Sequence, residues 1–203
     1  MRNMLLIMLL ICVIIVILPS KVEGKSLQDV LVNRASFLSN LQVRWDRDLH
    51  SPQHRPTEGQ IVNRVSSIMK YAKEFNHMAP ELYWRDTVLD IYAIMAVETG
   101  FVNYRSLDKG DSFGTGSMQW ETAKELLDGL SETYARWELG SDTKLQIKLV
   151  VYNYYKKYNH FNSRELAIVS YNQGFSVDTE TQRYEHYFFQ VNGRVEYIKN
   201  NLL

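Results

Sequence analysis

The chain has 203 residues, of which 45% are hydrophobic and 23% charged, so it is long enough to bury the core of one ordinary domain. Its 23 basic and 23 acidic residues cancel, and no basic stripe runs along the sequence, which argues against nucleic acid as a partner. The five histidines lack the spacing of metal ligands, and no phosphate loop or dinucleotide fingerprint is present. We therefore expect no metal and no other cofactor.

The N-terminus has the composition of a targeting segment. Arg2 precedes an uncharged apolar run over residues 4–18, and small residues at positions 22 and 24 suit a signal-peptidase site. Because this run is shorter than the ~20 residues that span a bilayer, residues 1–24 are predicted to be an export signal. The alternative is an uncleaved anchor that attaches the protein to a membrane through residues 4–18. Either reading places the remainder outside the cytoplasm, in the periplasm or cell envelope.

The only cysteine, Cys12, lies inside this apolar run, so the mature chain is expected to contain no disulfide and to be stabilised by packing alone. We expect a monomer.

Helical periodicity begins soon after the targeting segment. Apolar residues recur at helical spacing over residues 27–44, which predicts a first helix. The sequence Thr57-Glu58-Gly59-Gln60 is a capping-box pattern and predicts the start of a second helix. Together these helices form a predicted N-terminal segment, residues 25–79, packed on a domain that covers residues 80–203.

A third helix is expected to be capped by Asp86 and to end at Glu98, with Gly100 just beyond. The later periodic segments predict further helices at residues 118–130, 143–158, 164–173 and 184–201. Strand signals are nearly absent, so the chain is predicted to be a mainly α globule. At most, a short β-hairpin is expected near residues 103–116, where Lys109-Gly110-Asp111 is turn chemistry.

Four tyrosines of the predicted helix at 143–158 do not share one helical face, so at least half of them are expected to be exposed or to line a cleft. They are Tyr152, Tyr154, Tyr155 and Tyr158.

Glu98 does not fit the helix that carries it. The preceding residues are almost all Ile, Tyr, Ala, Met and Val, and the helix dipole disfavours negative charge in the last turn. If this end of the helix faces a cleft, apolar neighbours disfavour the charged form and raise the pKa of the Glu98 carboxyl. A raised pKa is what a general acid working near neutral pH requires.

Three short blocks follow one another from this helix onward. Ala96-Val97-Glu98-Thr99-Gly100-Phe101 ends the helix, Gly114-Thr115-Gly116-Ser117-Met118-Gln119 follows a polar loop that contains Gly110, and the stretch 166–174 reads Leu-Ala-Ile-Val-Ser-Tyr-Asn-Gln-Gly. In this order the blocks resemble the lytic transglycosylases of the soluble-transglycosylase type. The resemblance covers roughly residues 80–200, with Thr99 in place of the usual Ser and Ser117 in place of the usual Leu.

A fourth stretch, Glu180-Thr181-Gln182-Arg183-Tyr184, is similar to the Glu-Thr-x-x-Tyr segment with which this family supplies a tyrosine to its cleft. Counting from Glu180 selects Tyr184, whereas the run that follows the tyrosine in the family selects Tyr187. Both tyrosines stay candidates at this point.

The resemblance implies a lysozyme-like fold and an enzyme that cleaves the β-1,4 bond between N-acetylmuramic acid and N-acetylglucosamine in peptidoglycan. Glu98 would act first as acid and then as base, and the product would carry a 1,6-anhydromuramyl end, without a second carboxylate. The residues implied to bind the glycan strand are Thr99, Ser117, Met118, Gln119, Tyr171, Asn172, Tyr184 and Tyr187.

Two other functions stay open on the sequence. A lysozyme-type muramidase would hydrolyse the same bond with a water positioned by Asp108 or Asp111, which lie in the loop after Glu98. A non-catalytic peptidoglycan-binding module would keep the fold without turnover. The departures from the family pattern at Thr99 and Ser117 keep that reading open.

Overall fold

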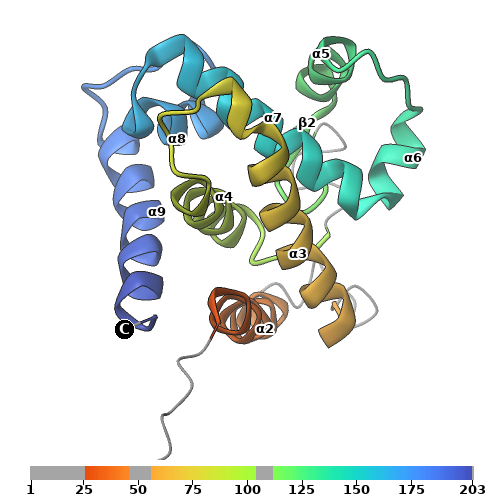
Figure 1. The fold of residues 1–203 in the computed structure, drawn as a ribbon, viewed down its shortest axis with the longest axis vertical. Coiled ribbons are helices and arrows are strands. Elements are labelled where there is room, and N and C mark those ends of the chain that lie inside the picture. Colours follow the sequence, from red (N-terminus) through yellow and green to blue (C-terminus); the bar gives the residue numbers. More distant parts are fainter. Residues whose placement is uncertain (1–25, 46–55, 104–111, 203) are drawn as a thin grey trace, which may run out of the picture.

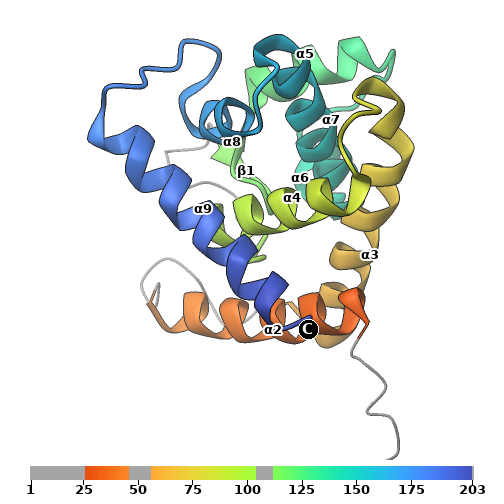
Figure 2. The same ribbon diagram turned by 60° about the vertical axis from the view of Figure 1, so that its left-hand side comes forward.

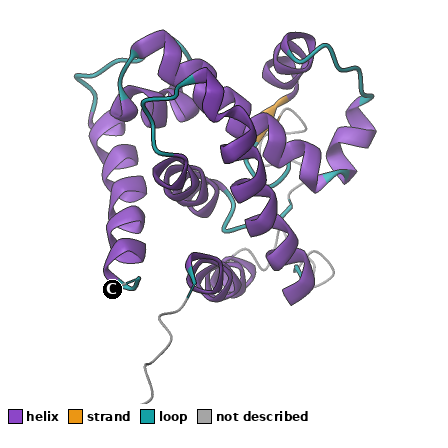
Figure 3. Ribbon diagram, viewed as in Figure 1, coloured by secondary structure: helices purple, strands orange, loops and turns teal. Residues whose placement is uncertain are grey.

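A computed structural model describes residues 26–45, 56–103 and 112–202, and these residues are mostly helical (Figures 1 and 3). The prediction of a mainly α chain is thus confirmed, whereas the predicted export signal, residues 1–24, and the expected turn Lys109-Gly110-Asp111 lie outside the described residues. The elements are α2 (Leu27–Trp45), α3 (Glu58–Glu74), the 3-10 helix η2 (Phe75–Met78), α4 (Trp84–Glu98), β1 (Ser112–Phe113), β2 (Met118–Gln119), α5 (Trp120–Gly129), α6 (Arg136–Ser141), α7 (Thr143–Phe161), α8 (Arg164–Gln173) and α9 (Gln182–Asn200).

Helix α4 lies in the middle of the fold. All residues from Thr87 to Ala96 are buried, because α3, α7 and α9 pack around the helix and α2 lies across its lower side (Figures 1 and 2). A helix that is apolar on every face is the kind that a globular protein can bury completely. Helix α3, from the predicted N-terminal segment 25–79, packs directly on α4 and α7 and so contributes to the same core.

One charged side chain is buried within α4. The carboxylate of Asp90 accepts hydrogen bonds from Arg164 Nε of α8 at 2.9 Å, from Arg164 Nη2 at 2.6 Å and from the Tyr154 hydroxyl of α7 at 2.7 Å. Burial raises the pKa of Asp90, while the bonds from Arg164 and Tyr154 oppose that rise. The Asp90 carboxylate therefore joins α4 to α7 through Tyr154 and to α8 through Arg164.

Local sequence signals set most helix starts. Thr57 caps α3 and forms the predicted capping box with Gln60, Asp142 accepts bonds from the first turn of α7, and Ser163 caps α8. The prediction that Asp86 caps α4 is wrong. The N-cap is Tyr83, and Asp86 lies in the first turn, where a negative charge still favours the helix N-terminus.

The short hairpin begins inside the predicted range 103–116 and ends just beyond it, at Gln119. Strand β1 pairs antiparallel with β2, with Ser112 opposite Gln119 and Phe113 opposite Met118. The turn between them is therefore 114–117, and it closes because Gly114 and Ser117 have positive φ angles of 82° and 52°. Met118 consequently belongs to a strand rather than to the helix predicted over 118–130.

Helix α7 carries the four tyrosines. Three of them are buried, Tyr154, Tyr155 and Tyr158, so the expectation that at least half are exposed or in a cleft is wrong. The reason is that α7 packs between α3 and η2 on one side and α8 on the other, which buries more than one face of the helix. The Tyr155 hydroxyl, for example, donates to the carbonyl of Ala72 in α3 at 2.8 Å.

Within residues 26–45, 56–103 and 112–202, no helix has the length and the apolar character needed to cross a membrane.

Candidate active site

Glu98 is the last residue of α4, and the chain turns sharply after it. The backbone N–H of Thr99 still donates to the Met95 carbonyl, but Gly100 and Phe101 then adopt positive φ angles of 56° and 68°. A left-handed phenylalanine is uncommon and must be held by its surroundings. Phe101 is fully buried, and its carbonyl accepts a hydrogen bond from the Arg64 guanidinium of α3. This turn ends the helix with the Glu98 side chain at the edge of the core.

A cavity of about 330 Å³ opens at this point, between the hairpin and α8. The residues of the three sequence blocks that line it together are Glu98, Ser117, Met118, Gln119, Tyr171, Asn172, Gln173 and Gly174. These positions are separated by up to about 70 residues in the chain, so their meeting at one cavity is a product of the fold. The carboxyl group of Glu98 thus shares its cavity with Met118 and Tyr171, two of the residues implied to bind the glycan strand.

Two side chains favour the charged form of the Glu98 carboxyl group. The Tyr187 hydroxyl of α9 donates to Glu98 Oε1 at 2.7 Å, and the side chain of Asn172 acts in the same direction. Burial raises the pKa of Glu98, and Tyr187, Asn172 and the charge of Arg183 only partly oppose that rise. Its pKa stays above the ordinary value of 4.5, which lets the carboxyl keep a proton at a higher pH than an exposed glutamate does.

The structure separates the two candidate tyrosines. The Tyr187 hydroxyl contacts the acid, whereas the Tyr184 hydroxyl donates to Glu165 Oε1 at 2.7 Å. Neither tyrosine is among the residues that line the cavity. The expectation that Tyr184 contacts the substrate is therefore not supported by its position. The two residues lie on α9 one turn apart, and only Tyr187 lies on the turn that faces the end of α4.

Thr99 has a different position from the one implied by the resemblance. It is fully buried, and its hydroxyl lies 3.2 Å from the Met95 carbonyl and 2.5 Å from the Thr115 carbonyl in the hairpin turn. Because both contacts are to backbone, Thr99 ties the end of α4 to the turn and does not line the cavity. This position does not support the substrate contact that the resemblance implies for Thr99.

Tyr171 fixes the opposite side of the cavity. Its hydroxyl donates to the Gly116 carbonyl at 2.7 Å, which joins α8 to the hairpin turn. A Cβ at Gly116 would lie 2.4 Å from Cγ2 of Val150 and 2.7 Å from the Tyr171 hydroxyl oxygen, so no larger residue fits without displacement. The glycine therefore permits the close approach that shapes the cavity.

Lys157 also lines the cavity, and sequence reasoning missed it. The residue is only 3% exposed, its ammonium group donates to the Ser170 carbonyl, and it lies 4.7 Å from the centroid of the Phe175 ring. Burial lowers its pKa to about 8. In sequence, a lysine within a run of polar and aromatic residues reads as a solvent-facing side chain, so only the packing of α7 against α8 reveals it.

A larger cavity, of about 430 Å³, lies elsewhere, between α3 and the start of α7. Glu98 does not line it. We regard the cavity beside Glu98 as the candidate active site, because it brings a partly buried acid with a raised pKa together with polar groups from three elements. In the part of the chain that the structure describes, no cluster of three or more His, Cys, Asp or Glu side chains could hold a metal ion.

Comparisons with protein-family models, with curated proteins and with solved structures gave no match for this chain. Its function is therefore inferred from the chemistry of the residues around Glu98.

Proposed function

We propose that this protein is an exported peptidoglycan lytic transglycosylase with a lysozyme-like fold, and that Glu98 is its single catalytic acid and base. The observation that carries the proposal is the environment of Glu98. Glu98 carries the only carboxyl group among the described residues that line this cavity, and its pKa is raised. The Tyr187 hydroxyl donates a hydrogen bond to that carboxyl group.

The arrangement of the elements supports the lysozyme-like assignment. A buried helix ends in the acid, a short hairpin lies beside that end, and the Tyr-Asn pair of α8 forms the facing side. These are the three blocks in which the sequence resembles lytic transglycosylases. The three blocks meet at one cavity, which supports a common role in one reaction. Chance sequence matches would not be expected to lie together in the fold.

The reaction needs no water and no second carboxylate. Protonated Glu98 gives its proton to the glycosidic oxygen as the bond from C1 of the muramyl residue breaks. The 6-hydroxyl of the same sugar then attacks C1 and gives its proton to the Glu98 carboxylate, which restores the acid and closes the 1,6-anhydro ring. The tyrosine bond stabilises the carboxylate between the two proton transfers.

The remaining side chains suit a sugar substrate. Met118 and Tyr171 provide apolar and aromatic surface, while Gln119, Asn172 and Ser117 offer polar groups to hydroxyl and acetamido substituents. A cavity of about 330 Å³ is at the small end of ligand pockets, so it fits one or two sugar rings of a longer glycan strand.

The rival muramidase reading depends on Asp108 or Asp111, which lie outside the described residues. The two functions differ in whether a second carboxylate positions a water molecule. If Asp108→Asn and Asp111→Asn both leave rate and product unchanged, hydrolysis assisted by either residue is ruled out.

The proposal is tested by the rate at which the purified protein clears a suspension of peptidoglycan. We expect Glu98→Gln to lower that rate by at least about 10²–10⁴-fold, the contribution of general acid and base catalysis. Glu165→Gln is the matched control, since Glu165 is an exposed acid that bonds Tyr184 and lies outside the cavity. Equal activity of the wild type and Glu98→Gln would refute the proposal.

A further inference from the structure

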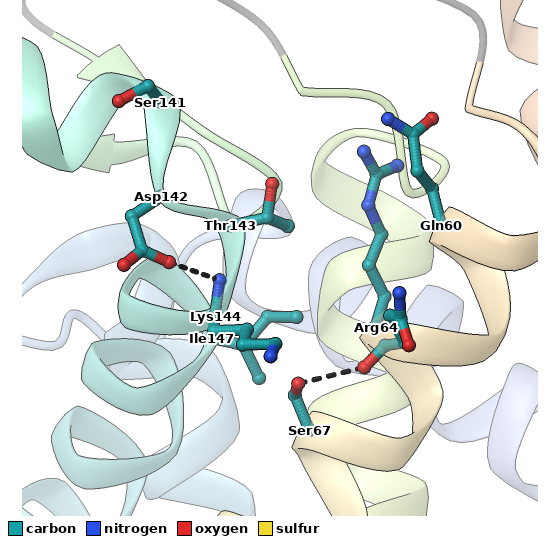
Figure 4. Close-up of a pocket in the computed structure, with 9 residues that line it drawn as sticks. Gln60, Arg64, Ser67, Ser141, Asp142, Thr143, Lys144 and Ile147 are labelled. Carbon is teal, nitrogen blue, oxygen red and sulfur yellow. Dashed lines mark hydrogen bonds between the residues drawn. The ribbon is translucent and has the colours of Figure 1, made fainter.

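We infer that the cavity of about 430 Å³ between α3 and the start of α7 is a second binding site, which takes a ligand carboxylate with Arg64 as its cationic anchor (Figure 4). This site is separate from the Glu98 cavity, and the inference does not depend on the proposed transglycosylase activity.

The guanidinium group of Arg64 is buried, and no counter-ion for it lies among the described residues. The residue is only 5% exposed, and its Nη1 donates a hydrogen bond to the Phe101 carbonyl. Its Nε has no partner, and no Asp or Glu among the described residues forms an ion pair with it. Burial lowers the pKa of Arg64 to about 10, which still leaves the group charged near neutral pH.

Arg164 of the same chain shows how a largely buried arginine is usually paired with a carboxylate. Arg164 pairs with Asp90 through Nε and Nη2, the two-donor geometry that matches a carboxylate. A buried charge that lacks such a partner is unfavourable by several kcal/mol. Arg64 is more buried than Arg164 and has only a neutral carbonyl, so a carboxylate from outside the chain would supply the missing charge.

The lining of the cavity suits a small polar anion. Figure 4 shows the Arg64 guanidinium between the side chain of Thr143 on one side and that of Gln60 on the other. Lys144 adds a second cation. Asp142 is the only acid among the described lining residues, and its Oδ1 already accepts the backbone N–H groups of Lys144 and Leu145 at 2.9 and 3.0 Å.

The start of α7 is therefore not itself the anion site, because Asp142 occupies its free N–H groups. The site is Arg64 with the hydroxyl and amide groups around it. Since Arg64 also holds the carbonyl of Phe101, three residues after Glu98, a bound carboxylate would contact the side chain that fixes the end of α4.

The experiment is an NMR titration of the full mature chain with acetate at constant ionic strength, with acetamide as the neutral probe of the same shape. We expect saturable shifts at residues around Arg64 with acetate and none with acetamide. Arg64→Met should weaken acetate binding by at least about tenfold. Arg85→Met, which removes an exposed arginine outside the cavity, should leave it unchanged.

Binding of acetate with equal strength to the wild type and Arg64→Met would overturn the inference, as would equal binding of acetamide or no saturable binding of acetate. If Arg64→Met does not fold, Arg64→Lys provides the test. It keeps the charge but loses the two-donor geometry, so it should still fold and bind acetate more weakly than the wild type does. Unchanged binding by a folded Arg64→Lys would equally contradict the site.

Discussion

The Glu98 carboxyl is subject to two opposing influences. Burial at the end of α4 disfavours its charge, whereas the hydroxyl of Tyr187 and the amide of Asn172 stabilise that charge. Burial is the larger influence, so the pKa of Glu98 stays above its ordinary value, as the proposed role of a single acid and base requires. A glutamate in a wholly apolar cavity would hold its proton too strongly for the first step.

The Tyr187 hydrogen bond makes this balance testable. Tyr187→Phe removes a donor to the carboxylate, so it should raise the pKa of Glu98 further. Activity that needs protonated Glu98 is lost as pH rises through that pKa, so the alkaline limb of the pH–rate profile should move to higher pH. Tyr184→Phe is the matched control, because Tyr184 bonds Glu165 instead and should leave the limb in place.

Protein stability should report the same raised pKa. In the unfolded chain the Glu98 carboxyl titrates near its ordinary pKa of 4.5, and in the folded chain it titrates at a higher pH. The contribution of Glu98 to folding stability is therefore fully present below its pKa in the unfolded chain. This contribution is lost as the pH rises through its pKa in the folded chain. The glutamine in Glu98→Gln does not ionise, so this pH-dependent loss of stability is absent from the variant.

We accordingly expect Glu98→Gln to gain stability relative to the wild type as the pH rises above the ordinary pKa of 4.5, as measured by urea unfolding at each pH. Glu185→Gln, at an exposed position of α9, should show no such trend. A constant difference between Glu98→Gln and the wild type across this range would mean that burial does not perturb the acid.

At the scale of elements, the hairpin and α8 form the two sides of the cavity and meet at Gly116. Gly116→Ala should destabilise the protein by about 1–3 kcal/mol, the usual cost of overpacking, because its Cβ would collide with Val150 and Tyr171. Activity should fall as well, since the collision pushes Tyr171 away from the turn. Thermal unfolding and the clearing assay measure both effects.

Gly193→Ala is the control for this substitution. Nothing lies within 4 Å of a Cβ at Gly193, which is in the interior of α9, so alanine should stabilise the helix by about 0.5–1 kcal/mol. If both alanine variants behave alike, Gly116 does not have the close contact that the structure shows.

Several elements could be predicted because their signals are local. Thr57 with Gln60, Asp142 and Ser163 each satisfy backbone N–H groups a few residues away, so their caps can be read without knowing the fold. Asp86 shows the limit of this reasoning, because a cap residue and a favourable first-turn acid look alike in sequence. The short helix α6 carries only a weak periodic signal and was not predicted.

The site could be predicted in part for the same reason. Glu98 was recognisable as a misfit within its own helix, and Met118 and Tyr171 followed from short blocks. The choice between Tyr184 and Tyr187, the buried lysine at 157 and the structural position of Thr99 all depend on how α7, α8 and α9 pack. No pattern within a single element contains that information.

At the scale of the whole molecule, the buried pair of Asp90 and Arg164 links the central helix to the helices that carry the site. Asp90→Asn removes the charge and leaves Arg164 without its partner, so we expect a loss of about 3 kcal/mol of folding free energy. This is the low end for a buried pair, because the Arg164 side chain is 34% exposed. Urea unfolding measures the loss.

The exposed pair of Lys124 and Glu121 is the comparison, with side chains 46% and 76% exposed. Glu121→Gln should change stability very little, because exposed ion pairs contribute little in water. Equal effects of Asp90→Asn and Glu121→Gln would mean that the Asp90 pair does not hold the core together.

The most direct test of the central claim is mass analysis of the fragments released from purified peptidoglycan by the intact protein. A single acid with an internal 6-hydroxyl nucleophile predicts muramyl ends that are 1,6-anhydro and therefore lack one water relative to a hydrolytic product. Fragments with ordinary reducing ends would contradict the account, because they require a water molecule as the attacking group.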